Sequence, residues 1–175
     1  EPVREPFSPE QAARYLDTAS LNWQKRRKCA TCHTNMPYLM ARPSLTASLP
    51  DSGEVRGFFE DYFLTRWEKG KKTPEKPYRP VVVGAALAFN DAQTSGSLSE
   101  VTRKTLDLMW TTQGEEGAWK WAKCGWAPME IDDHYGVTLA VLAAGIAPGD
   151  YAETEAAKAG LEKAKGYLKT HSGPS

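Results

Sequence analysis

The chain of 175 residues has no hydrophobic run long enough to cross a membrane, and its formal net charge is zero. A membrane-spanning helix needs about 20 consecutive apolar residues, so we expect no membrane-spanning segment. Without an excess of Lys and Arg, there is no electrostatic case for binding nucleic acid or an anionic membrane surface. The share of apolar residues, 41%, is ordinary for a soluble protein and predicts a single globular domain over residues 1–175.

Cysteine and histidine are scarce, with three of each, and their spacing argues against two common kinds of site. A structural zinc site needs a second Cys/His pair at ligand spacing, which the sequence lacks. A thioredoxin-like dithiol lies in a strand–helix–strand pattern, which is also missing. What remains is Cys29-Ala30-Thr31-Cys32-His33, which fits C-x-x-C-H, the attachment signal of a c-type haem.

Each defined residue of this motif has a separate chemical role. Cys29 and Cys32 would add to the haem vinyl groups as thioethers, and His33 would bind the iron as the proximal ligand. We therefore expect one covalently bound haem c, with Cys124 left as a single thiol. Covalent haem attachment generally takes place on the outer side of the bacterial membrane, so we expect a periplasmic or otherwise exported protein. The polar N-terminus, Glu1–Arg4, has the character of a processed or engineered end.

Hydrophobic periodicity predicts helices along most of the chain. The expected helices that are apolar on one face begin at Ser8, near Asp51 to Glu54, at Ser97 or Ser99, and after Asp150. The others are a helix starting near Asn35 or Met36 and shortened by Pro43, and two that are apolar on every side, Val81–Phe89 and Tyr135–Ile146. The basic run Lys25–Lys28 and the motif are expected to form a loop.

Helices that are apolar on one face thus alternate along the chain with the shortened helix and the two helices that are apolar on every side. This pattern predicts an all-α fold. We expect an antiparallel α-hairpin array of about seven helices, in which an outer layer packs on an inner one as in a partial α/α toroid. The long connections, 23–34, 68–80 and 113–132, follow the outer helices. Antiparallel hairpins place such connections at one end, so the haem and the loop 113–132 should meet there.

The loop 113–132 and its exit supply the candidates for the second axial iron ligand. His134 is the first candidate, Met129 and Cys124 are alternatives, and an open or water-bound site remains a further one. Methionines elsewhere, Met36, Met40 and Met109, are expected in the core. Three tryptophans of the loop could cover the porphyrin or pack the loop onto the helices: Trp119, Trp121 and Trp126.

One stretch of this loop resembles a known repeat. Gln113-Gly114-Glu115-Glu116-Gly117-Ala118-Trp119 is similar to the Q-x-x-x-G-x-W repeat of the squalene–hopene cyclase and prenyltransferase superfamily, and the stretch 29–45 resembles the haem-bearing repeat of exported bacterial proteins that combine such repeats with one C-x-x-C-H. The resemblance implies an α/α-toroid-like fold and a haem, but no known reaction. Three and a half hairpins cannot close a ring of six. The ring is therefore partial, continues outside this chain, or is extended through a homo-oligomer.

These features predict a mono-haem c-type cytochrome that transfers single electrons to or from a redox partner protein, with no catalytic residues assigned. The first alternative is a haem enzyme or a sensor that binds a diatomic gas or peroxide at an open sixth site. The second is a structural or interaction module stapled by the haem. The run Lys25–Lys28 would be a solvated face, or would pair with the haem propionates or an acidic partner.

Overall fold

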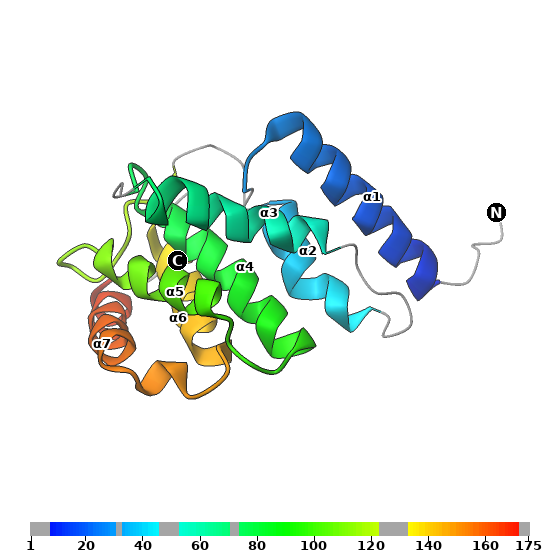
Figure 1. Cartoon of the computed structure of the whole chain (residues 1–175). Coiled ribbons are helices and arrows are strands. Elements are labelled where there is room, and N and C mark those ends of the chain that lie inside the picture. Colours follow the sequence, from blue (N-terminus) through cyan, green and yellow to red (C-terminus); the bar gives the residue numbers. More distant parts are fainter. Residues whose placement is uncertain (1–7, 31–32, 46–52, 71–73, 123–132, 172–175) are drawn as a thin grey trace, which may run out of the picture.

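The computed structural model describes residues 8–30, 33–45, 53–70, 74–122 and 133–171, and this part of the chain is all-helical, without strands. Its seven α-helices confirm the all-α prediction and the expected number (Figure 1). They are α1 (Pro9–Arg27), α2 (Asn35–Ala41), α3 (Glu54–Phe63), α4 (Tyr78–Thr94), α5 (Glu100–Thr111), α6 (Asp133–Ile146) and α7 (Glu155–Thr170). Shorter turns are η1 (Arg42–Ser44), the π-helical η2 (Leu64–Glu68) and η3 (Tyr151–Glu153). None of the described helices is long and apolar enough to span a membrane.

Polar caps at three N-termini explain where helices begin. The Ser8 hydroxyl accepts a hydrogen bond from the Gln11 amide at 3.2 Å, and Pro9 occupies the first helical position. Ser99, not Ser97, caps α5 by accepting from the Thr102 amide at 3.1 Å. Thr154 caps α7 in the same way. Pro43 limits α2 to seven residues, after which the chain continues as the turn η1.

Two helices extend beyond their predicted bounds. The run Lys25–Lys28 was expected in a loop, but α1 continues to Arg27 and ends at Lys28, whose φ of 47° is left-handed. Basic residues favour a helix C-terminus because they interact with the negative end of the helix dipole. Likewise, α4 begins at Tyr78, within the predicted loop 68–80, and continues to Thr94.

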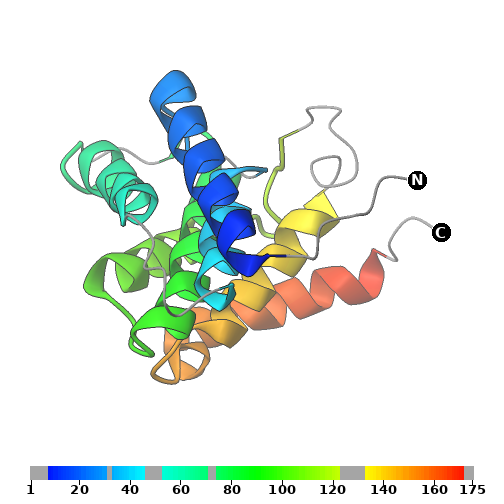
Figure 2. The same ribbon diagram turned by 90° about the vertical axis from the view of Figure 1, so that its right-hand side faces the viewer.

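The helices pack in two layers around α4. The even-numbered helices lie side by side in the order α2, α4, α6, and the odd-numbered ones contact one another in the order α1, α3, α5, α7. Contacts of α1 with α2, of α3 and α5 with α4, and of α7 with α6 join the two layers. Figure 1 places α4 at the centre with α1 and α7 on opposite sides, and Figure 2 shows α6 and α7 side by side.

Hydrogen bonds fix the directions of these helices. The Asn90 side chain in the last part of α4 donates to the Leu39 carbonyl near the end of α2 at 3.3 Å, while the start of α4 lies beside His33, just before α2. Consequently α2 and α4 run in the same direction. The Thr112 hydroxyl, after α5, donates to the Pro77 carbonyl before α4 at 3.2 Å, so α4 and α5 are antiparallel.

The Gln113–Trp119 stretch fastens the end of α5 to α7. The Gln113 side-chain amide donates to the carbonyls of Gly117 and Gly160, each at 3.0 Å. Gly117 has a φ of +95°, and a Cβ atom there would collide with the Lys163 carbonyl of α7. Trp119 is fully buried and its Nε1 donates to the Met109 carbonyl at 3.0 Å. Three positions of the Q-x-x-x-G-x-W pattern thus have a packing role.

Both α4 and α6 were predicted to be buried on every side. The structure confirms this for residues 80–88 of α4, but α6 is only partly buried. All residues from Pro80 to Ala88 are buried in α4, as an apolar sequence on every side predicts. On α6, by contrast, Leu142 is 51% and Ile146 is 39% exposed. One side of α6 therefore presents apolar side chains on the surface of the described part of the chain.

Candidate functional site

A small cavity joins the C-x-x-C-H motif to α3 and α4. Its volume is about 100 Å³. It is lined by Cys29, Ala30, His33, Tyr62, Tyr78, Arg79, Val82 and Val83. The motif loop supplies the first three residues, α3 supplies Tyr62, and the first turns of α4 supply the rest. The motif therefore lies against the apolar start of the central helix.

Of the motif itself, the structure describes Cys29, Ala30 and His33. Cys29 is half-buried with a free thiol, and His33 is exposed. Thr31 and Cys32 lie outside the described residues. A thiol and an imidazole that line the same cavity are the donor types that haem attachment and iron ligation require.

The end of α1 contacts His33 through Trp23. The ring centroids of Trp23 and His33 are 5.3 Å apart and the rings are nearly perpendicular, at 80°. The guanidinium of Arg27 lies 5.1 Å above the Trp23 ring, within the range of a cation–π contact. The Trp23 Nε1 is buried and has no hydrogen-bond partner within the described part of the chain. Because α1 continues to Arg27, the wall beside His33 is helical.

Asp17 fixes α1 to the chain after the motif, through an ion pair with Arg42 of η1 and a hydrogen bond from Tyr38 of α2. Asp17 of α1 accepts hydrogen bonds from Arg42 Nε at 2.8 Å and from the Tyr38 hydroxyl at 2.7 Å. Burial raises the pKa of the Asp17 carboxyl, but the bonds from Arg42 and Tyr38 and the charge of Arg42 outweigh it and hold that pKa below its usual value. The two helices that flank the motif are thereby held together.

The loop 113–132 reaches the cavity through a contact between Trp121 and Tyr78. The Trp121 ring packs against Tyr78, with 5.3 Å between centroids, and against Tyr135 of α6, with 5.4 Å. The Trp121 amide donates to Asp133 Oδ1 at 2.9 Å, which ties the loop to the first residue of α6. Since Tyr78 also lines the cavity, the motif and the described start of the loop 113–132 lie at the same end of the helices.

The other predicted site residues have different positions. Trp119 packs on Trp110 of α5, with 5.8 Å between ring centroids, and does not line the cavity. His134 is half-buried in the first turn of α6 and is likewise not among the described residues that line it. Met36 and Met109 are buried in the core and Met40 packs against it. Cys124, Trp126 and Met129 lie outside the described residues, as Cys32 does.

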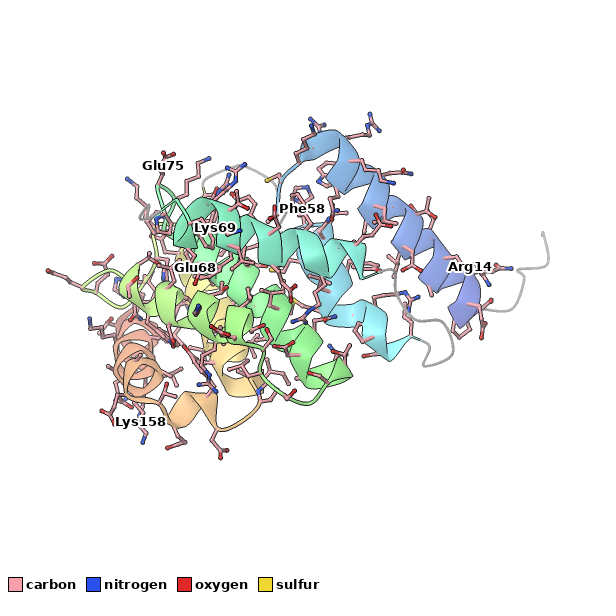
Figure 3. All side chains as sticks on the ribbon, viewed as in Figure 1. Arg14, Phe58, Glu68, Lys69, Glu75 and Lys158 are labelled. Carbon is pink, nitrogen blue, oxygen red and sulfur yellow. The ribbon has the colours of Figure 1, made fainter. Side chains whose placement is uncertain are left out.

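A larger groove adjoins the cavity. Its volume is about 620 Å³. It is lined by Tyr62, Thr65, Arg66, Trp67, Gly70, Pro74, Glu75, Lys76 and Arg79, so that Tyr62 and Arg79 belong to both spaces. Figure 3 labels Glu75, Lys69 and Glu68 in the charged region around η2. A flat group attached at Cys29 and His33 could therefore extend from the cavity into the larger groove.

The residues around the motif fit a haem by their chemistry. Val82 and Val83 give an apolar wall, Tyr62 and Tyr78 give aromatic rings, and Arg79 gives a positive charge for a propionate. The cavity alone is smaller than the roughly 300–1,000 Å³ of typical cofactor sites, whereas the groove lies within that range. Among the described residues, no three His, Cys, Asp or Glu side chains form a cluster that could hold a metal ion.

Four residues around the motif were not predicted to lie there: Trp23, Tyr62, Tyr78 and Arg79. Trp23 and Tyr62 were assigned only to the apolar faces of their helices, and Tyr78 and Arg79 to a loop. The signal for the last two was Pro77 followed by helix-compatible residues, since a proline favours the start of a helix. No sequence pattern indicated that Tyr62 would face the motif.

No protein-family model matches the chain, and comparisons with curated proteins and with solved structures also gave no match.

Proposed function

We propose that this protein is a mono-haem c-type cytochrome that transfers single electrons. Cys29 and Cys32 hold the haem c covalently, and His33 is the proximal ligand of its iron. The observation that carries the proposal is that Cys29 and His33, from one C-x-x-C-H motif, line the same cavity with the apolar start of α4. The bound group supplies a reversible ferric–ferrous couple, and the surrounding residues supply its attachment, orientation and electrostatic environment.

The exposure of the motif supports electron transfer in particular. His33 is exposed and Cys29 is only half-buried, so these residues would hold a haem close to the surface. Lys25, Arg26 and Arg27 form the last turn of α1 directly before the motif, and all three are exposed. Their charges favour approach of a redox partner protein with an acidic surface.

The two-layer packing supports an α/α-toroid-like scaffold as part of the same proposal. The inner helices α2, α4 and α6 lie side by side, and α1, α3, α5 and α7 cover them. His134, Met129 and Cys124 remain the proposed candidates for the second axial ligand, and Trp121 and Trp126 remain candidates for contact with the haem. Covalent haem attachment makes a periplasmic or other exported location part of the proposal.

The direct test is expression with a bacterial c-type haem maturation system, followed by haem staining of the denatured chain on a gel. The wild-type chain should stain and Cys29→Ser should lose most of the stain. His33→Ala should retain thioether bonds where attachment occurs but lose the low-spin spectrum. Cys124→Ser is the matched control, and it should stain like the wild type. Equal staining of Cys29→Ser would contradict covalent attachment through the motif.

The lining of the cavity favours one alternative, a haem enzyme or gas-binding protein with an open sixth site. Besides Cys29 and His33, its described lining consists of Ala30, Tyr62, Tyr78, Arg79, Val82 and Val83, without a second histidine or a methionine. The absorption spectrum of the reduced protein distinguishes the two functions. Sharp α and β bands that carbon monoxide does not change support electron transfer. A broad high-spin spectrum that shifts with carbon monoxide supports the open site.

A further inference from the structure

The groove beside the motif contains an unusual pair of arginines. Arg66 of η2 and Arg79 of α4 both lie over the ring of Tyr62, with their guanidinium carbons 4.6 Å and 5.6 Å from its centroid. Both line the groove, and Arg79 also lines the cavity with Cys29 and His33. Two positive groups from different helices are thereby brought to one aromatic ring.

The Tyr62 ring under these arginines is buried in a cluster of aromatic rings. Tyr62 is only 5% exposed, and its ring contacts Trp67 edge to face, with 5.5 Å between centroids. Trp67 is buried as well, and it also packs edge to face on Phe63. Contact of each guanidinium with this buried ring restricts the arginine side chain, which reduces the entropy lost when a ligand binds.

The charge of the two arginines is not neutralised within the described part of the chain. Neither guanidinium forms an ion pair with a described carboxylate, although Arg56 nearby in sequence is paired with Glu60 and Asp91. Lys76 adds a positive charge to the groove and Glu75 a negative one, so the lining has a net positive charge. A planar guanidinium matches the geometry of a carboxylate by donating two parallel hydrogen bonds.

We propose that Arg66, Arg79 and the Tyr62 ring form a binding site for a flat organic molecule that bears a carboxylate. The flat part lies in the groove, beside the lining residues Tyr62, Trp67 and Pro74, and the arginines bind the carboxylate. The volume of about 620 Å³ is within the range of small-molecule sites. Two sources have this chemistry: the propionates of a haem attached at Cys29, and a free aromatic carboxylate.

The first arm of the test uses the protein as isolated and measures binding of benzoate by calorimetry. Benzamide has the same ring without the charge, and acetate has the same charge without the ring. A free-ligand site predicts that benzoate binds at least about tenfold more tightly than either. Arg66→Gln and Arg79→Gln should each weaken benzoate binding by about tenfold or more, and Arg79→Lys by less, because it keeps the charge.

Arg103→Gln is the matched control for these variants. Arg103 also lies over a buried tyrosine ring, that of Tyr151, at 5.8 Å, but it does not line the groove. Arg103→Gln removes the same charge and the same kind of contact with a ring, but outside the groove. Benzoate binding should therefore be unchanged in this variant. Equal weakening by Arg103→Gln, or equal binding of benzoate and benzamide, would overturn a free-ligand site.

The second arm identifies the propionates as occupants. In the haem-loaded chain, the midpoint potential is measured against pH for the wild type and for the same three Gln variants. Propionates bound by Arg66 and Arg79 predict that both variants change this pH dependence and that Arg103→Gln does not, while benzoate fails to bind. If neither arm separates the groove variants from the control, the carboxylate site is refuted. The benzoate measurement tests the free-ligand site even if the chain carries no haem. Failure of the proposed cytochrome function is therefore a separate result from failure of the carboxylate site.

Discussion

The indole ring of Trp23 meets the imidazole of His33 edge to face, at 5.3 Å between centroids. Trp23 belongs to α1 and His33 directly precedes the turn into α2, so this contact joins the two ends of the motif loop. The Trp23 Nε1 is buried without a hydrogen-bond partner among the described residues. The ring therefore positions His33 by shape, and its polar atom contributes nothing to that contact.

This relationship predicts different results for two substitutions of Trp23. Trp23→Phe keeps an aromatic ring beside His33 and removes the unpaired N–H group, so the free energy of unfolding should stay within about 1 kcal/mol of the wild type. Trp23→Ala removes the ring and should cost about 2 kcal/mol, less than at a fully buried tryptophan because Trp23 is half-buried. Urea unfolding followed by circular dichroism measures both. Equal losses in the two variants would contradict a role of the ring in packing.

The ion pair between Asp17 and Arg42 predicts a loss of stability in acid. The pKa of Asp17 is lowered in the folded protein, so this carboxylate stabilises the fold fully above its unfolded pKa of about 3.9, and the contribution is lost as the pH falls through the folded pKa. Arg42 is buried, with a side chain only 2% exposed. Asp17→Asn should therefore cost about 2–4 kcal/mol at pH 7, because it removes the negative charge that binds the buried guanidinium at 2.8 Å.

The pH dependence of that difference supplies the check. Urea unfolding at pH 7 and in steps down to pH 2.5 should show the wild type and Asp17→Asn converging as Asp17 becomes protonated. Glu115→Gln removes a carboxylate from an exposed position and should follow the wild type at every pH. A difference between Asp17→Asn and the wild type that is independent of pH would show that the ion pair contributes nothing to the acid sensitivity.

Local signals in the sequence were sufficient for most of the helices. Ser8 with Pro9 marked the start of α1, Ser99 was one of two candidates for the cap of α5, and the continuous apolar run from Val81 identified the buried central helix. Each of these signals acts within one or two helical turns, so it does not depend on the rest of the fold. The end of α1 was predicted too early, because a basic run is compatible with a solvated helix as well as with a loop.

The site was predictable only in part, for a related reason. The C-x-x-C-H spacing identifies Cys29, Cys32 and His33 without any tertiary structure, since the chemistry is contained in adjacent residues. The walls around them come from other helices, and the faces that Tyr62 and Arg79 present depend on how α3 and α4 pack. Periodicity assigns a residue to the buried face of a helix, but it does not specify which partner that face meets.

Trp119 and Trp121 allow a test of hydrogen bonding within one loop. Both are buried, but the Nε1 of Trp119 donates to the Met109 carbonyl at 3.0 Å, whereas that of Trp121 has no partner among the described residues. Trp119→Phe should therefore cost about 1 kcal/mol more than Trp121→Phe, because it removes a buried hydrogen bond, while the Met109 carbonyl keeps its bonds from Thr112. Chemical unfolding of the two variants measures the difference. If both substitutions cost the same, the bond to Met109 does not contribute to stability.

The attachment of the loop to α7 predicts that Gly117 tolerates no side chain. Gly117 has a φ of +95°, and a Cβ atom would overlap the Lys163 carbonyl oxygen of α7, which is backbone and cannot turn away. Gly149 also has a positive φ, +70°, but a Cβ atom there would have nothing within 4 Å. Gly149→Ala should therefore cost only the backbone strain, about 1 kcal/mol.

Gly117→Ala should cost about 3 kcal/mol or more, because strain and collision add at the same position. Thermal unfolding ranks the two variants, and hydrogen exchange locates the damage. Amides of α7 near Lys163 should lose protection in Gly117→Ala and keep it in Gly149→Ala, since only the first substitution forces the loop away from α7. Equal stability of the two variants would mean that the close contact between Gly117 and Lys163 does not exist in solution.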